Sequence, residues 1–170
     1  MDKLIIKGNA KISGIVNVHG SKNSALPIIV SSLLSEKTLK LSNVPNVVDV
    51  LNLIKLLKNY GVKIEHKKNK LKINPSKIKN LSADYDVVRK MRASILILGP
   101  LLSRFGEARI SLPGGCAIGT RPIDIHLAGL SKLGANFEIQ NGFVVGSVKS
   151  QLIGNKIKLP FPSVGATENI

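Results

Sequence analysis

An internal repeat constrains the fold of this chain more than any other feature of its sequence. One copy runs through residues 24–66 and the second through residues 93–139, and both present apolar and polar segments in the same order. The copies are spaced more widely than the roughly 20–50 residues of a solenoid unit. Each copy is therefore more typical of a small α/β module.

Each module is predicted to form a helix, a short strand, a second helix and a β-hairpin. In the first copy these elements are expected at residues 23–34, 38–41, 47–60, and 62–66 paired with 71–74. In the second copy they are expected at residues 86–102, 108–112, 123–133, and 136–139 paired with 143–148. This order predicts a mixed α/β (α+β) fold.

The apolar pattern predicts which faces of the helices are buried. The first helix of each copy is apolar nearly all round, which is typical of a helix enclosed by other elements. In the second helix of the first copy, apolar residues recur three and four positions apart, which predicts one buried face. That face consists of Val47, Val50, Leu51, Ile54 and Leu57. Lys55 and Lys58 of the same helix are then expected to face water.

Glycines mark the ends of several predicted elements. Gly61 and Gly134 follow the two second helices, where a left-handed cap is favoured. Asn141 and Gly142 join the strands of the second hairpin and form a strong two-residue turn signal. Residues 162–167 then repeat the start of a first helix, and the sequence ends at Ile170 within it. We therefore expect a fragment, or one partner of a larger assembly.

The charge balance narrows the class of partner. The chain carries 25 Lys and Arg against 10 Asp and Glu, a formal net charge of +15, which favours nucleotides, phosphorylated small molecules, nucleic acid or an acidic membrane. One cysteine fits a reducing compartment. Asp2, Lys3 and Lys7 interrupt the stretch where a signal peptide would be apolar, and the longest apolar run is far shorter than the ~20 residues of a membrane span. These features predict a soluble cytoplasmic protein.

The loop of residues 113–122 has the strongest chemical signature. Its glycines let the backbone approach a ligand closely, and Pro122 suits the first turn of a following helix whose free N–H groups attract anions. Cys116 lies near Arg121 and near that positive helix end, which lowers the pKa of a thiol. A lone cysteine is more often buried and inert, but the neighbouring glycines favour a reactive one.

Three further segments carry groups that suit anions. Lys22 and Asn23 stand at the first helix, Arg92 lies within an apolar helix, and Ser163 opens the third copy. Each has an ordinary alternative: a helix cap for the first and third, and a structural carboxylate partner for Arg92. The presence of all these groups in one chain is stronger evidence for an anion-binding site than any one of them.

Other candidate sites are weaker. The lysine-rich run at residues 63–79 alternates with apolar residues and is more typical of the wet face of a hairpin than of a nucleic-acid site. The chain has no tryptophan and few aromatic residues for base stacking. His19, His66 and His126 lack metal-ligand spacing, although His126 follows the cysteine loop closely enough to support it. We therefore expect neither a metal nor a nucleic-acid partner.

Several segments together resemble the UDP-N-acetylglucosamine enolpyruvyl transferase family. The resemblance extends in order from residue 1 to residue 170 and is carried by Lys22-Asn23, residues 91–94, 113–116 and 121–124, and 163–167. The sister family, 5-enolpyruvylshikimate-3-phosphate synthase, shares the fold but does not carry the Pro-Gly-Gly-Cys loop, so it ranks second.

The resemblance implies a two-domain enzyme, each domain an inside-out α/β barrel of βαβαββ repeats with the helices enclosed by sheets. Residues 1–21 are expected to form strands that pack with a second domain, and residues 22–170 to form an incomplete first domain. The activity implied is enolpyruvyl transfer from phosphoenolpyruvate to the 3-hydroxyl of UDP-N-acetylglucosamine, with no metal or organic cofactor. Because the base that deprotonates the 3-hydroxyl belongs to the second domain, the chain is expected to be inactive without a complementary C-terminal polypeptide.

The resemblance also assigns roles to individual residues. Cys116 is expected to protonate the methylene carbon of phosphoenolpyruvate and to be the target of fosfomycin. The residues expected to hold phosphoenolpyruvate are Lys22, Arg92 and Arg121. The residues expected to bind UDP-N-acetylglucosamine are Asn23, Ala93, Arg121, Pro122, Ile123, Asp124, Ile125, Ser163, Val164 and Gly165. A non-catalytic module that binds anions or nucleic acid stays open as the alternative, and steep salt-dependent binding to duplex DNA would favour it.

Overall fold

The computed structural model describes residues 3–9, 11–79, 81, 92–112 and 123–170. It confirms the predicted order of elements in both modules. The first module holds α1 (Lys22–Ser31), η1 (Ser32–Leu34), β1 (Leu39–Leu41), α2 (Val48–Asn59), β2 (Lys63–Lys67) and β3 (Lys70–Asn74). The second holds η2 (Arg92–Ile97), α4 (Leu98–Phe105), β4 (Glu107–Ser111), α5 (Asp124–Lys132), β5 (Ala135–Gln140) and β6 (Phe143–Val148), and α6 (Val164–Asn169) follows.

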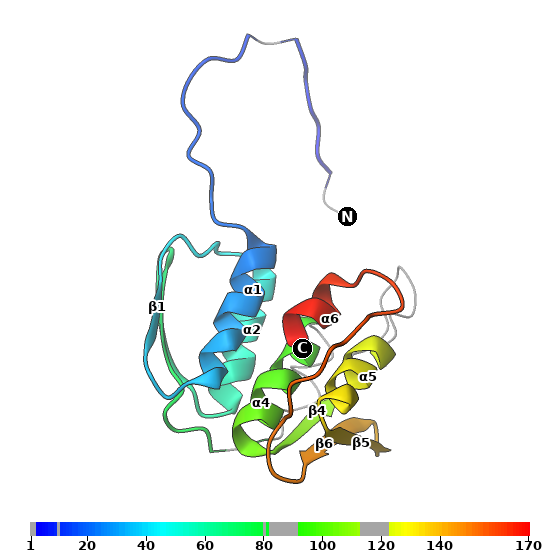
Figure 1. The fold of residues 1–170 in the computed structure, drawn as a ribbon. Helices are drawn as coiled ribbons and strands as arrows, with labels where there is room; N and C mark the ends of the chain where they lie inside the picture. The colour runs from blue at the N-terminus through cyan, green and yellow to red at the C-terminus, as the bar shows by residue number, and fades with distance from the viewer. Residues whose placement is uncertain (1–2, 10, 80, 82–91, 113–122) are drawn as a thin grey trace.

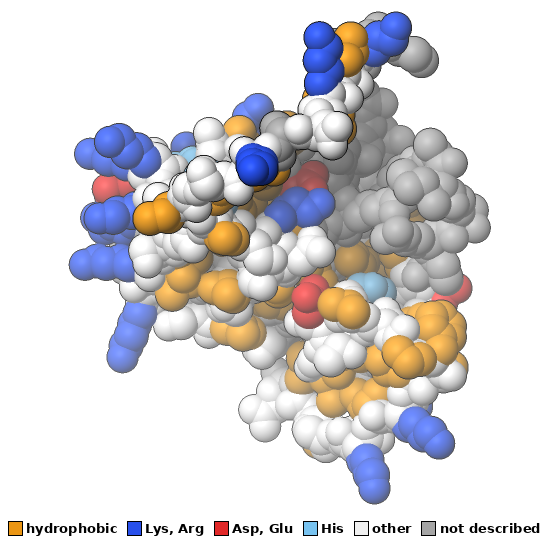
Figure 2. All heavy atoms as spheres, turned by 90° about the horizontal axis from the view of Figure 1, so that it is seen from above, with side chains coloured by type: hydrophobic (Ala, Val, Ile, Leu, Met, Phe, Trp, Pro, Cys, Tyr) orange, Lys and Arg blue, Asp and Glu red, His pale blue; other side chains and the backbone are white. Residues whose placement is uncertain are grey.

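The two modules build sheets of the same topology. Both sheets are antiparallel, with strand orders β1-β3-β2 and β4-β6-β5, so the last strand of each module lies in the middle. In the first sheet Ile64 and Ile73 are paired and buried, while the lysines between the apolar positions are exposed. Figure 2 shows Lys and Arg side chains gathered on the side of the molecule where this sheet lies. The predicted wet face of the hairpin is therefore confirmed.

The helices α2, α4 and α5 pack against the sheets, and both modules surround one hydrophobic core. Figure 1 shows α1 and α2 beside the first sheet, with α4 between them and the second sheet. Most of the large, fully buried side chains come from α1, η1, α2, β3, η2 and α4. Among them are Ile29, Leu33, Leu53, Leu56, Leu57, Ile73, Ile97, Leu98 and Leu101, each 0% exposed. The repeated modules thus share a core and do not form two separate units.

Two predicted helix faces are corrected by the packing. The first helix is not enclosed all round, because Ile28 is 45% exposed. In the second helix, Val50, Ile54 and Leu57 are buried as predicted. The N-cap Val47 and Leu51 are instead each 37% exposed, and Leu53 and Leu56 are fully buried in addition. Spacings of three and four residues fit two overlapping stripes on this leucine-rich helix. Contacts with α1, β2 and η2 select the stripe that is buried.

The helix predicted at residues 86–102 also differs from the structure. Its described part is a 3-10 segment that ends at Ile97, followed by α4, which extends to Phe105. Pro100 lies in the first turn of α4, where a missing N–H costs no hydrogen bond, and this favours a new helix start. Gly106 ends α4 with φ +73° and donates its N–H to the carbonyl of Leu102.

The predicted glycine positions are confirmed. Gly61 and Gly134 follow α2 and α5 with φ of +92° and +100°. Asn141 and Gly142 both have positive φ, as a type I′ hairpin turn requires. The two helix ends and the hairpin turn therefore form at the positions that the sequence predicts.

The N-terminal segment leaves the body of the molecule as an extended arm (Figure 1). Residues 3–9 and 11–21, predicted as strands, pair with neither sheet and expose most of their apolar side chains, among them Ile12 at 95% and Ile15 at 94%. A strand exists only through hydrogen bonds to a neighbour, and the described residues offer none here. The packing of this arm against a second domain stays a prediction.

Candidate anion-binding site

The start of α1 concentrates positive charge at one point. Ser21 is the N-cap, and its hydroxyl accepts a hydrogen bond from the Ser24 backbone N–H at 3.4 Å. Lys22 is the first residue of the helix, and no acidic residue stands in that first turn. A cation at the positive end of a helix opposes the helix dipole. This arrangement disfavours the isolated helix but attracts an anion.

Lys22 has a partner that the sequence analysis missed. Its Nζ donates to Oδ2 of Asp49 at 2.7 Å. Asp49 lies in the first turn of α2, where a carboxylate is favoured by the helix dipole. The sequence did contain a signal for this pair, namely the acidic residue in the first turn of the second helix. If the two helices of one module begin side by side, Lys22 and Asp49 come into contact.

A tight backbone contact brings these two helix starts together. Gly20, just before α1, lies against the carbonyl of Asn43 and the ring of Pro45, which lead into α2. A Cβ at Gly20 would collide with that carbonyl oxygen. Asn43 itself has φ +58°. The entry to α1 therefore depends on a residue without a side chain.

The segment η2 joins the elements that carry the other predicted residues. Arg92 and Ala93 form the beginning of η2, which packs against α1, α2, α4 and α6. The helix α6 in turn packs against α5. The backbone thus gathers the segments that hold Lys22, Asn23 and Gly165 around η2.

The predicted residues of α5 and α6 have varied environments. Ile123 is the N-cap of α5, and Asp124 is exposed in its first turn, with Ile125 half-buried beside it. Ser163 caps α6 by accepting a hydrogen bond from the Ala166 N–H at 3.3 Å, so its capping role is confirmed. The exposed fraction of Val164, the first residue of α6, is 76%.

A buried polar network connects α4, α5 and α6. Oδ1 of Asn169 accepts the Gly99 N–H at 3.0 Å, and Nδ2 of Asn169 lies 3.1 Å from Nδ1 of His126. The His126 ring also approaches Gly165, where a Cβ would come within 3.3 Å of it. Burial lowers the pKa of His126, because desolvation disfavours the imidazolium. The predicted support of the cysteine loop by His126 stays a prediction, because that loop lies outside the described residues; the partner of His126 in the described part of the chain is Asn169.

Part of the predicted site lies outside the described residues. Cys116, Arg121 and Pro122 fall there, so the distance from the sulfur to Lys22 stays a prediction. No group of His, Cys, Asp and Glu side chains suited to a metal ion occurs in the described part of the chain. Within the same part, no helix has the length and apolar character to cross a membrane.

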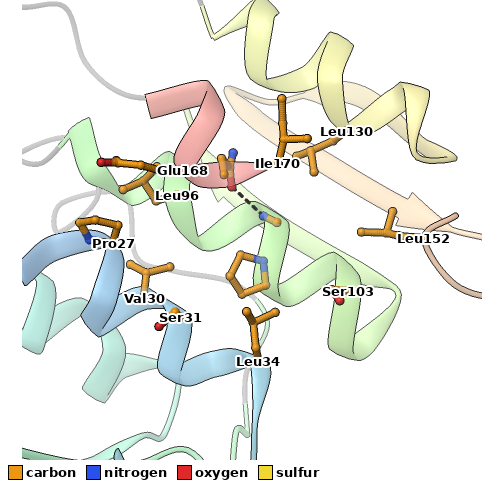
Figure 3. A pocket seen from close by; sticks show the side chains of 13 residues that line it. Pro27, Val30, Ser31, Leu34, Leu96, Ser103, Leu130, Leu152, Glu168 and Ile170 are labelled. Atoms are coloured by element: carbon orange, nitrogen blue, oxygen red, sulfur yellow. Dashed lines mark hydrogen bonds between the residues drawn. The ribbon is translucent and has the colours of Figure 1, made fainter. Parts of the chain in front are cut away.

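A separate pocket of about 310 Å³ opens between α1, η2, α4 and α6. Figure 3 shows Val30 and Leu34 on one side of it and Leu130 and Ile170 on the other. Its lining is mainly apolar, and Glu168 is the charged residue there. This chemistry suits an apolar side chain and not an anion, so the pocket is distinct from the start of α1.

A family model described as EPSP synthase (3-phosphoshikimate 1-carboxyvinyltransferase) matches residues 6–170. The chain belongs to the EPSP synthase family. This membership agrees with the expected family and its sister, which share one fold.

Relatives within the EPSP synthase family carry a more specific name. The UDP-N-acetylglucosamine 1-carboxyvinyltransferase of Campylobacter hominis is 53% identical over 171 residues, which cover 100% of this chain and 40% of that protein. The protein of the same name from Pelagibacter ubique is 51% identical over 170 residues, or 100% of this chain and 41% of its own length. The chain therefore spans about two fifths of the length of the curated relatives it matches.

Solved structures of enolpyruvyl transferases share the fold. The enolpyruvyl transferase NikO from Streptomyces tendae superposes with a TM-score of 0.72 and 20% identity, covering 86% of this chain and 32% of that one. EPSP synthase from Acinetobacter baumannii superposes with a TM-score of 0.70 and 20% identity, covering 92% of this chain and 36% of that one. The mixed α/β fold is therefore that of the EPSP synthase family.

Proposed function

We propose that this chain is the N-terminal part of a UDP-N-acetylglucosamine 1-carboxyvinyltransferase, a cytoplasmic enzyme of the first step of peptidoglycan synthesis. The observation that carries the proposal is 53% identity, across the whole chain, to a relative of that name. The finer fold belongs to the same proposal: the described modules form part of an inside-out barrel, with helices enclosed by sheets.

The reaction is an addition followed by an elimination. The 3-hydroxyl of the sugar gives its proton to the base of the second domain, its oxygen bonds to the phosphate-bearing carbon of phosphoenolpyruvate, and Cys116 gives a proton to the methylene carbon. The tetrahedral ketal then loses phosphate together with a proton from the resulting methyl group, which restores the double bond. Lys22, Arg92 and Arg121 hold the phosphate and carboxylate. The cation at the first residue of α1, which opposes the dipole of its own helix, supports this role for Lys22.

The nucleotide sugar binds around η2. Asn23, Ala93, residues 121–125 and residues 163–165 contribute contacts, as the family resemblance implies. The packing of α1 and α6 against η2, and of α5 against α6, supports a common binding region for these segments. No metal or organic cofactor is required, because the leaving phosphate and the proton transfers are handled by side chains.

An assay with a complementing polypeptide tests this function. The chain is mixed with the C-terminal part of the Campylobacter hominis relative that it does not cover, and phosphate release is followed with both substrates. We expect release from the mixture and not from the chain alone. Lys22→Gln should reduce the rate at least about tenfold, whereas Lys58→Gln, on the exposed face of α2, should not. Release by the lone chain, or none from the mixture, would contradict the proposal.

The name of the family model favours one other function, that of an EPSP synthase. Replacing UDP-N-acetylglucosamine with shikimate 3-phosphate in the same assay separates the two activities. Mass spectrometry after fosfomycin treatment of the mixture provides a second readout, since an adduct on Cys116 would support the first function.

A further inference from the structure

We propose that Asp49 is a positioning residue for Lys22: it fixes the ammonium group at the start of α1, ready to receive the anionic substrate. This inference rests on the proposed function, in which Lys22 holds phosphoenolpyruvate. It adds a residue of α2 that the family resemblance did not assign. Asp49 itself does not touch the substrate.

The geometry leaves Lys22 free to bind an anion while Asp49 holds it. A lysine ammonium has three N–H donors, and the contact with Oδ2 of Asp49 at 2.7 Å uses one of them. The Lys22 side chain is 46% exposed and the Asp49 side chain 40% exposed. The remaining donors are therefore accessible to a phosphate or carboxylate without breaking the pair.

The charges also explain why the Lys22 ammonium needs a partner that fixes its position. Its position at the positive end of α1 is electrostatically unfavourable, and its own helix supplies no acidic residue in the first turn. Asp49 is favoured at the start of α2 for the opposite reason. The carboxylate thus compensates the cation from a second helix. Local arrangements that oppose their own helix are typical of functional sites.

The backbone holds the two partners in register. Gly20 packs on Asn43 and Pro45, so the starts of α1 and α2 stay adjacent. The two helices also pack against each other. Most of the precision in the placement of Lys22 therefore comes from the frame, and Asp49 selects one direction for a long, flexible side chain.

Two substitutions at Asp49 separate positioning from charge. Asp49→Ala removes the acceptor, and we expect phosphoenolpyruvate to bind about two- to fivefold more weakly to the complemented protein, the range for a partly exposed ion pair. Asp49→Asn keeps an acceptor oxygen and should bind at least as tightly as the natural protein. If Asp49 acted only as a repelling charge, both variants would bind more tightly, and that result would overturn the proposal.

A double-mutant cycle and a matched control complete the test. In a Lys22→Gln background, Asp49→Ala should have no further effect on phosphoenolpyruvate binding. Glu65→Ala breaks a comparable exposed pair, with Lys72 at 2.9 Å on the first sheet, and should leave binding unchanged. A full effect of Asp49→Ala without Lys22 would show that Asp49 acts elsewhere and would overturn the proposal.

The mobility of the Lys22 ammonium distinguishes this inference from the proposed function. Nitrogen NMR of the lysine side chains in the 170-residue chain should show a slowed Lys22 signal that Asp49→Ala makes mobile. Equal mobility in both proteins would overturn the positioning role even if phosphoenolpyruvate binds through Lys22. An ordered Lys22 whose replacement leaves phosphoenolpyruvate binding unchanged would instead overturn the function proposed for Lys22, and the positioning role with it.

Discussion

Asn169 shows how one side chain fixes the chemistry of its neighbours. Its Oδ1 accepts the backbone N–H of Gly99, a group that only donates, so its Nδ2 must face Nδ1 of His126. Nδ1 is then the acceptor, and the imidazole carries its hydrogen on Nε2. A second proton on Nδ1 would break this contact in a buried position. The neutral form of His126 is therefore part of the folded structure.

Acid should destabilise the chain through His126. Well above pH 6.5 the imidazole is neutral in both the folded and the unfolded states, so this residue contributes no pH dependence there. As the pH falls through 6.5, the unfolded chain binds a proton that the folded chain resists until its lowered pKa is reached. The free energy of unfolding should thus decrease with acidification, as urea titrations between about pH 7.5 and pH 5.5 would show.

A neutral replacement provides the control for this pH effect. His126→Gln keeps an acceptor for Asn169 but does not titrate, so its free energy of unfolding should depend less on pH than that of the natural chain. An identical pH dependence in the two proteins would show that His126 is not the responsible group.

At the scale of the elements, α6 is held by backbone contact more than by its own length. It has six residues, too few for a stable isolated helix. Its end lies on two glycines: Gly99 of α4 meets the backbone of Asn169, and Gly129 of α5 meets the side chain of Ile170. The absence of side chains on α4 and α5 at these points is what lets α6 approach.

Gly99→Ala should therefore detach α6. The new Cβ would collide with the carbonyl oxygen of Asn169 and lie 2.9 Å from its Oδ1. We expect the free energy of unfolding to fall by about 1–3 kcal/mol, the usual cost of overpacking, in urea denaturation followed by circular dichroism. Gly154→Ala is the matched control, because a Cβ there meets nothing within 4 Å. Equal effects of the two substitutions would contradict the close packing of α6.

At the scale of the whole molecule, Arg104 connects the two modules. This residue of α4 donates to the carbonyls of Leu33, Ser35 and Pro75 at 3.1–3.2 Å and pairs with Glu36 at 3.2 Å. Its side chain is 14% exposed, whereas that of Glu36 is 77% exposed. Most of the polar contacts of the guanidinium are with these three carbonyls. Arg104 therefore acts mainly by donating several hydrogen bonds from the second module to the first.

Replacing Arg104 should weaken the whole fold. Arg104→Met leaves carbonyls of the first module without their donor, and we expect a loss of about 1–3 kcal/mol in the free energy of unfolding by urea. Arg104→Lys keeps the charge but not the planar fork and should be intermediate. Glu36→Ala should change stability by less than about 0.5 kcal/mol. A larger loss for Glu36→Ala than for Arg104→Met would show that the ion pair, and not the carbonyl contacts, joins the modules.

The sequence alone predicted the features that depend on local chemistry. The repeated order of elements, the left-handed glycines at 61 and 134, and the turn at Asn141 and Gly142 all follow from backbone preferences within a few residues. The cap at Ser163 follows in the same way, although the sequence offered it only as the alternative to an anion site. Lys22 and Asn23 were also placed correctly at the start of a helix. These features can be predicted because each depends on residues that lie within a few positions of it in the sequence.

Only the tertiary structure decided the features that depend on distant partners. It selected Leu53 and Leu56 as buried in α2, paired Lys22 with Asp49, and turned His126 toward Asn169. Each of these contacts joins residues from different elements, and periodicity is compatible with several such arrangements. The choice among them comes from packing the two modules into one core, because the free energy gained there depends on all the surfaces at once.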